Sequence, residues 1–180
     1  MDRRTAEPAA AASGADVALL RLDEDTPAVR RARAAVLKMR LAPGQRRFAR
    51  DAVEALPRAD ADPHRTPFAV LHTGRPVGFG ILDRRGILAE LTDAPGRALL
   101  LRAFYLAPEW QGRGIGRAAC AALDPLARAV APDAREILLT VNEDNPPAIR
   151  SYLAGGFERT GRRYLGGDAG PQQVMRRPIH

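Results

Sequence analysis

Residues 98–117, ALLLRAFYLAPEWQGRGIGR, decide the fold of this chain. The first part, Ala98–Leu106, is almost wholly apolar, which is typical of a strand covered on both faces of a sheet. Three alternate glycines follow, Gly112, Gly114 and Gly116, and a helical pattern of apolar residues begins directly after them. Glycines there let the backbone bend sharply and approach a ligand closely. Because the first N–H groups of a helix lack partners within the helix, this turn predicts a site for an anion such as a phosphate.

The glycine spacing differs from two common phosphate-binding motifs. A P-loop ends in Gly-Lys-Ser/Thr, but no lysine lies near this turn, and a dinucleotide-binding turn needs G-x-G-x-x-G. Arg113 and Arg117 add positive charge beside the glycines. A turn that serves only to pack a helix on a strand is the alternative, and Gln111–Gly116 alone does not separate the two interpretations.

The rest of the chain predicts one mixed α/β or α+β domain over residues 16–180, after a disordered leader at residues 1–15. Strand 98–106, helix 115–130, interrupted by Pro125, and strand 137–141 form a βαβ unit. Those two strands should therefore be parallel, with a right-handed crossover. Residues 83–97 carry no assignable pattern. Further strands are expected at 17–22, 68–72, 77–82, 157–160 and 173–178, and further helices from 26 to Pro43-Gly44, at 48–56 ending before Pro57, and at 146–154.

Composition excludes several classes of protein. A length of 180 residues suits one domain, and a hydrophobic fraction of 46% is that of an ordinary globular protein. No apolar run approaches the roughly 20 residues of a membrane helix, and the N-terminus lacks the apolar core of a secretory signal. We therefore expect a cytoplasmic protein without a membrane partner. One cysteine, Cys120, and three scattered histidines predict neither a disulfide nor a metal site.

The net charge of +7 raises the possibility of nucleic-acid binding. However, the arginines are dispersed along the chain and accompany acidic residues, and Lys38 is the only lysine. Such a composition is typical of a coding bias, so we expect no nucleic-acid partner. The positive charge could still steer an anionic cofactor toward its site.

A second cluster, Val141–Phe157, reads VNEDNPPAIRSYLAGGF and follows the other parallel strand. Asn145 before a proline is typical of a helix N-cap. Tyr152 lies seven residues later, about two helical turns, so both side chains project from one face. A tyrosine beside Ile149 and Leu153 can serve packing alone, but a phenol at the edge of a cleft can also donate a proton.

Together the two clusters resemble the GNAT superfamily of acetyl-CoA-dependent N-acetyltransferases. The family's phosphate loop, Q/R-x-x-G-x-G/A, is matched by Gln111, Gly114 and Gly116. Its later signature, N-x-x-A-x-x-x-Y followed by G-F, is matched by Asn145, Ala148, Tyr152, Gly156 and Phe157. The resemblance covers the element order from 16 to 178. It implies a mixed, mostly antiparallel central sheet with a parallel βαβ core, flanked by helices.

The resemblance also implies a site for acetyl-CoA where the parallel strands splay apart. Leu106 would lie near the thioester, and Asn145 would contact the cofactor. Tyr152 would protonate the departing thiolate while an acceptor amine attacks directly, without an acyl-enzyme; Cys120 would serve packing. The pyrophosphate would be bound by the backbone N–H groups of Gln111, Gly112, Arg113, Gly114, Ile115, Gly116 and Arg117.

The general base is left open by the resemblance. Some family members carry a glutamate on the strand before the glycine turn, but this chain has Leu99–Leu101 there, and Arg102 is the strand's only charged residue. Glu90 is the first candidate. A water chain could also take the proton, and the other candidates are Asp93, Glu143 and Asp144.

Within the family, the chain looks most like small bacterial diamine and polyamine acetyltransferases, through Leu41–Leu56, Pro67–Leu82 and Thr160–Ile179. A polycation would favour an acidic pocket, whereas Gln172 and Gln173 stand where those enzymes tend to carry a glutamate. We therefore predict a primary amine of a small molecule as acceptor. A protein amine, or a catalytically weak acyl-CoA-binding or regulatory module, is the alternative. Edge strands in such a fold could support a homodimer.

Overall fold

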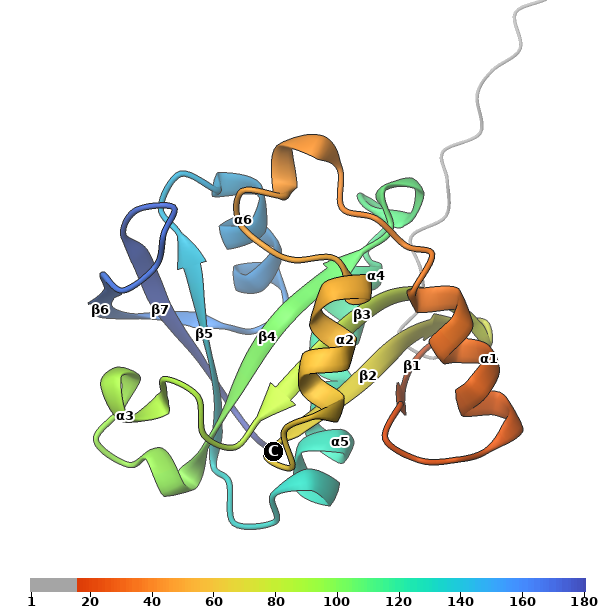
Figure 1. Ribbon diagram of the computed structural model, residues 1–180. Coiled ribbons are helices and arrows are strands. Elements are labelled where there is room, and N and C mark those ends of the chain that lie inside the picture. Colours follow the sequence, from red (N-terminus) through yellow and green to blue (C-terminus); the bar gives the residue numbers. More distant parts are fainter. Residues whose placement is uncertain (1–15) are drawn as a thin grey trace, which may run out of the picture.

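The computed structural model describes residues 16–180, so the leader expected at residues 1–15 lies outside the described residues. Its centre is a seven-stranded sheet in the order β1-β2-β3-β4-β5-β7-β6 (Figure 1). β4 and β5 are parallel and every other neighbouring pair is antiparallel, which confirms the predicted βαβ unit. The strands are β1 Val17–Arg21, β2 Arg65–His72, β3 Arg75–Asp83, β4 Ala98–Leu106, β5 Glu136–Asn142, β6 Glu158–Tyr164 and β7 Gln172–Pro178.

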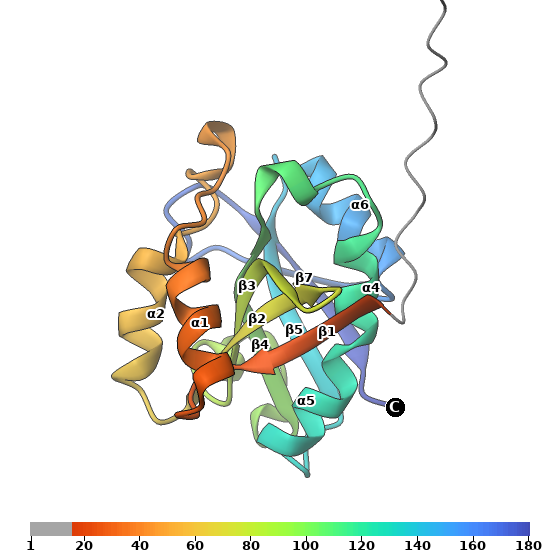
Figure 2. The same ribbon diagram turned by 90° about the vertical axis from the view of Figure 1, so that its right-hand side faces the viewer.

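Helices cover both faces of the sheet, as Figure 2 shows. α1 and α2 bury their apolar sides against Phe79, Ile81 and Tyr105 on one face. α4, α5 and α6 cover the other face, and α3 packs at a corner beside the start of β4. Among residues 16–180, no helix is long and apolar enough to cross a membrane. The helices are α1 Pro27–Val36, α2 Ala52–Asp60, α3 Leu88–Leu91, α4 Ile115–Ala121, α5 Leu123–Val130 and α6 Pro146–Ala154, with 3₁₀ turns at Pro43–Gln45, Pro95–Arg97 and Pro108–Trp110.

Three helix boundaries differ from the sequence prediction. α1 ends at Val36, well before Pro43. α2 runs through Pro57, because its buried face stabilises the helix on both sides of the missing N–H group. The predicted helix 115–130 is two helices that meet at Ala122. Pro125 lies in the first turn of α5, where its missing N–H group costs no helical hydrogen bond.

β4 and β5 separate toward their C-terminal ends. Ala98–Leu100 of β4 pair with Glu136–Leu138 of β5, and the pairing ends there although both strands continue. β4 carries a bulge at Ala103, whose φ of 47° is left-handed and which shifts the register with β3. A bulge bends its strand, so β4 turns away from β5 here (Figure 1). Residues 101–106 of β4 and 139–142 of β5 are called the diverging ends below.

Candidate active site

The glycine turn, residues 111–117, joins the diverging end of β4 to α4. Gly112 and Gly114 have φ values of 73° and 79°, and Gly114 occupies the N-cap of α4. No atom of the described part of the chain lies within 4 Å of a Cβ built on either residue, so glycine is needed here for its backbone conformation and not for space. Among residues 16–180, no acceptor is found for the backbone N–H groups from Gly112 to Arg117. The turn therefore presents consecutive donors to an anion.

The side chain of Gln111 holds the turn in place. Its Nε2 donates to the carbonyl oxygen of Leu106 over 3.0 Å, and it exchanges amide hydrogen bonds of 3.2 Å with Gln45. Its backbone N–H donates to the carbonyl oxygen of Pro108 at 3.2 Å. The donors without a partner therefore begin at Gly112, one residue later than the sequence predicts.

Trp110 fixes the turn against the β2–β3 hairpin, a contact that sequence reasoning missed. The guanidinium group of Arg113 lies 4.9 Å from the Trp110 ring centroid, and that of Arg75 lies 5.5 Å from it. The ring of His72 lies 5.5 Å from the same ring. The contacts of Trp110 with Arg75 and His72 join segments far apart in the chain, so no local pattern signals them.

Tyr152, on α6, lies among aromatic side chains on the α4–α6 face of the sheet. Its ring centroid is 6.3 Å from that of Phe104, on the diverging end of β4, and 5.6 Å from that of Phe157. Burial raises the pKa of Tyr152 above its ordinary value, and nearby Cys120 raises it further. The hydroxyl therefore keeps its proton near neutral pH, while the same burial makes it a weaker acid. The flanking rings equally suit a packing role.

Cys120 belongs to the contact between α4 and α6. A Cβ added at Gly155 would lie 2.7 Å from the Cys120 sulfur, so the two helices touch through these small residues. Burial raises the pKa of the Cys120 thiol to about 12, and a thiol of that pKa is a poor nucleophile at neutral pH. The geometry agrees with the packing role expected for this cysteine.

Asn145 and Leu106 both lie beside the diverging ends. The Asn145 side chain caps α6 by accepting a hydrogen bond of 3.4 Å from the N–H of Ala148. Leu106 is buried, and its side chain lies 3.8 Å from the position of a Cβ on Gly116. These two residues, the glycine turn and the aromatic surroundings of Tyr152 thus gather at one end of the parallel pair. Their contacts with acetyl-CoA stay predictions.

Glu90 does not join this group. It is exposed on α3, whose Leu88 and Leu91 pack with Ala98 and Leu100 at the start of β4. The glycine turn follows the other end of that strand, roughly 25 Å away at the usual rise per residue. The other candidate bases are ion-paired: Asp93 with Arg162 at 2.9 Å, Glu143 with Arg163 at 2.7 Å, and Asp144 with Arg47 at 3.9 Å.

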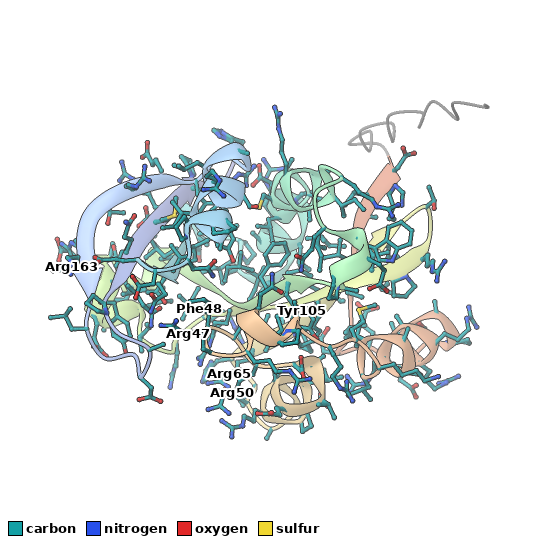
Figure 3. The ribbon with its side chains drawn as sticks, turned by 90° about the horizontal axis from the view of Figure 1, so that it is seen from above. Arg47, Phe48, Arg50, Arg65, Tyr105 and Arg163 are labelled. Atoms are coloured by element: carbon teal, nitrogen blue, oxygen red, sulfur yellow. The ribbon has the colours of Figure 1, made fainter. Side chains whose placement is uncertain are left out.

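The α1–α2 connection, residues 37–51, is a part of the site that sequence reasoning did not find. Gln45 contacts Gln111 after β4, and Arg47 contacts Asp144 after β5. The connection therefore spans the diverging ends, as Figures 1 and 3 show. The sequence predicts helix over much of this segment. In the structure, the buried carboxylate of Asp51, at the end of the connection, accepts a hydrogen bond of 2.6 Å from the N–H of Leu41 and so fixes the course of the connection.

Residues 33–157 match the acetyltransferase (GNAT) family. The chain belongs to this family. Family membership makes it an acetyl-CoA-dependent N-acetyltransferase, with acetyl-CoA as cosubstrate. The uncharacterized N-acetyltransferase YbbJ of Bacillus subtilis (strain 168) is 34% identical over 122 residues, which cover 67% of this chain and 76% of YbbJ.

Two solved structures confirm the fold. The aminoglycoside acetyltransferase AAC(6')-Ib in complex with ribostamycin and coenzyme A has a TM-score of 0.69 and 23% identity, over 91% of this chain and 93% of that one. Spermidine N-acetyltransferase from Vibrio cholerae in complex with CoA and spermine has a TM-score of 0.61 and 18% identity, over 92% of this chain and 96% of that one. At these identities the likeness concerns the fold.

Proposed function

We propose that this enzyme transfers the acetyl group of acetyl-CoA to a primary amine of a small molecule, by direct attack of the amine in a ternary complex. The observation that carries the proposal is the run of backbone N–H groups from Gly112 to Arg117, at the diverging end of β4, which have no acceptor within the described residues 16–180. Consecutive donors at a helix start, with Arg113 and Arg117 beside them, favour the pyrophosphate of CoA.

The diverging end of β4 would hold the extended arm of the cosubstrate. Beyond Leu100 the β5 side of β4 pairs with none of the strands described in residues 16–180, so its backbone groups can pair with the amides of that arm as another strand would. Leu106 would then lie near the thioester, and Asn145 would contact the cosubstrate from the start of α6. Gln111 supports this arrangement through its bond to the carbonyl oxygen of Leu106.

Tyr152 would act as the acid. The amine nitrogen attacks the thioester carbon, the C–S bond breaks, and the departing thiolate takes the proton of the Tyr152 hydroxyl. The nitrogen of the new amide loses its extra proton to solvent, and solvent reprotonates Tyr152. Solvent also takes the proton that the acceptor ammonium loses before attack, since Glu90 lies far from the glycine turn and Glu143 is held by an arginine.

Release of free thiol from acetyl-CoA across a panel of primary amines tests the proposal, with CoA binding measured by calorimetry on the same protein. We expect amine-dependent thiol release and an equal amount of acetylated amine. If CoA binds but no small amine raises release above background, the chain is instead a catalytically weak acyl-CoA-binding module. Release that depends only on a protein substrate would point to a protein amine.

A further inference from the structure

The α1–α2 connection, residues 37–51, forms the side of the site opposite α4 and α6. Its Gln45 is hydrogen-bonded to Gln111 of the glycine turn, and its Arg47 forms an ion pair with Asp144, which follows β5. An acceptor that approached the thioester from the α1–α2 face of the sheet would pass this connection, which would then form the entrance for amines.

This entrance is basic. Residues 37–51 contain five basic side chains and one acidic side chain, Asp51. Asp51 is buried, accepts a hydrogen bond from Leu41, and lies 3.4 Å from Arg46, so it is already engaged. Together with residues 142–144 and 163–170, which border the same end of the sheet, the segment carries six basic and four acidic side chains.

Each of the two carboxylates at the end of β5 faces an arginine. Glu143 accepts two hydrogen bonds from Arg163 of β6, at 2.7 and 3.1 Å, in a bidentate pair. Asp144 faces Arg47 at 3.9 Å, while its own N–H donates to the Asn142 side chain at 2.8 Å. An amine with several positive charges would have to displace Arg163 from Glu143, which disfavours a polycation.

Arg47 is the side chain best placed to recognise an acceptor. Its guanidinium lies 4.7 Å from the centroid of the Phe48 ring, so the two side chains lie against each other (Figure 3). Its side chain is 61% exposed, and at 3.9 Å the contact with Asp144 is an ion pair and not a hydrogen bond. Its N–H donors therefore remain available, in a geometry suited to the two oxygens of a carboxylate or phosphate.

Building on the proposed amine acetylation, we propose that the acceptor also carries an anionic group, a carboxylate or a phosphate, which Arg47 binds. The amine end of such an acceptor would point toward the thioester and its anionic end toward the connection. The anionic group would replace Asp144 as the close partner of Arg47. This separates the chain from spermidine N-acetyltransferase, whose structure holds the polyamine spermine.

Matched pairs of amines test the inference, because the members of each pair share one amine and differ in the anionic group. Lysine is compared with cadaverine, and O-phosphoethanolamine with ethanolamine, by kcat/KM at saturating acetyl-CoA. We expect the anionic member of at least one pair to be preferred by roughly tenfold, the effect of one charge-assisted hydrogen bond. The pair with the larger preference distinguishes a carboxylate from a phosphate.

Arg47→Gln should abolish that preference and leave the KM for acetyl-CoA unchanged. Arg31→Gln is the matched control, since it removes the same charge from an exposed position on α1 and should keep the preference. Preference for cadaverine and ethanolamine, or a preference that survives Arg47→Gln, would overturn the inference. No turnover of any amine in a protein that binds CoA would instead remove the proposed function, and the inference with it.

Discussion

At the scale of single residues, the site depends most on the Tyr152 hydroxyl, because it is the one acidic proton that the proposed reaction draws from the protein. The ring is held on two sides by Phe104 and Phe157, so its position does not depend on the hydroxyl. Removing only the hydroxyl therefore separates chemistry from packing.

We predict that Tyr152→Phe lowers kcat on the order of a hundredfold, the usual contribution of general acid catalysis. The KM for acetyl-CoA should hardly change, because the proton is transferred only in the transition state. Steady-state kinetics with both substrates measures this, and an unchanged melting temperature would show that packing is intact. A variant with wild-type kcat would assign the phenol to packing.

The raised pKa of Tyr152 predicts the shape of the pH profile. Burial disfavours the phenolate, so the proton donor stays protonated up to and beyond its ordinary pKa of 10.0. The acceptor amine, in contrast, becomes reactive as it loses its proton with rising pH. We expect kcat/KM for the amine to rise with pH and to show no descending limb below pH 10. A decline that begins near pH 8, in a protein still folded there, would contradict this assignment.

At the scale of elements, the proposed binding of the cosubstrate depends on the backbone conformation of Gly112 and Gly114 in the glycine turn. Gly114→Val should weaken CoA binding, because φ near 79° is strained for a β-branched residue by about 1–2 kcal/mol and the turn must rearrange its N–H groups to relieve that strain. Calorimetric titration with CoA measures the loss of affinity.

Gly96→Val is the matched control for that variant. Gly96 has the same open space around its Cβ position but no positive φ, and it lies in the 3₁₀ turn before β4, far from the glycine turn. It should keep CoA affinity. Equal affinities of the Gly114 variant and the wild type would refute the pyrophosphate site.

At the scale of the whole molecule, the sequence predicts the structural features that depend on residues close together in the chain. The apolar run before the glycines and the Asn145–Phe157 signature each lie within one strand–turn–helix segment, and both segments are placed as predicted. Features that depend on distant contacts were missed, such as the bulge at Ala103 and the passage of α2 through Pro57. Glu90 was the first candidate base, but only the folded chain shows that α3 packs at the opposite end of β4.

The two halves of the site are joined through Tyr105, whose ring packs with Phe79 beneath α1 and α2. Its hydroxyl accepts a hydrogen bond of 2.8 Å from the N–H of Ala52, at the junction of the α1–α2 connection and α2. The glycine turn therefore follows the end of β4, and Tyr105 of the same strand anchors the α1–α2 connection. A loss of this bond should disturb the connection, while the glycine turn keeps the hydrogen bond from Gln111 to the carbonyl oxygen of Leu106.

We predict that Tyr105→Phe lowers the free energy of unfolding by about 1–3 kcal/mol, because the buried N–H of Ala52 loses its partner. It should raise the KM for the amine and leave that for acetyl-CoA unchanged. Urea unfolding and steady-state kinetics measure the two effects. Tyr164→Phe removes a hydroxyl for which no hydrogen bond is found within residues 16–180, so it should change neither. If both KM values rise together in Tyr105→Phe, the connection and the turn move as one unit and not as two.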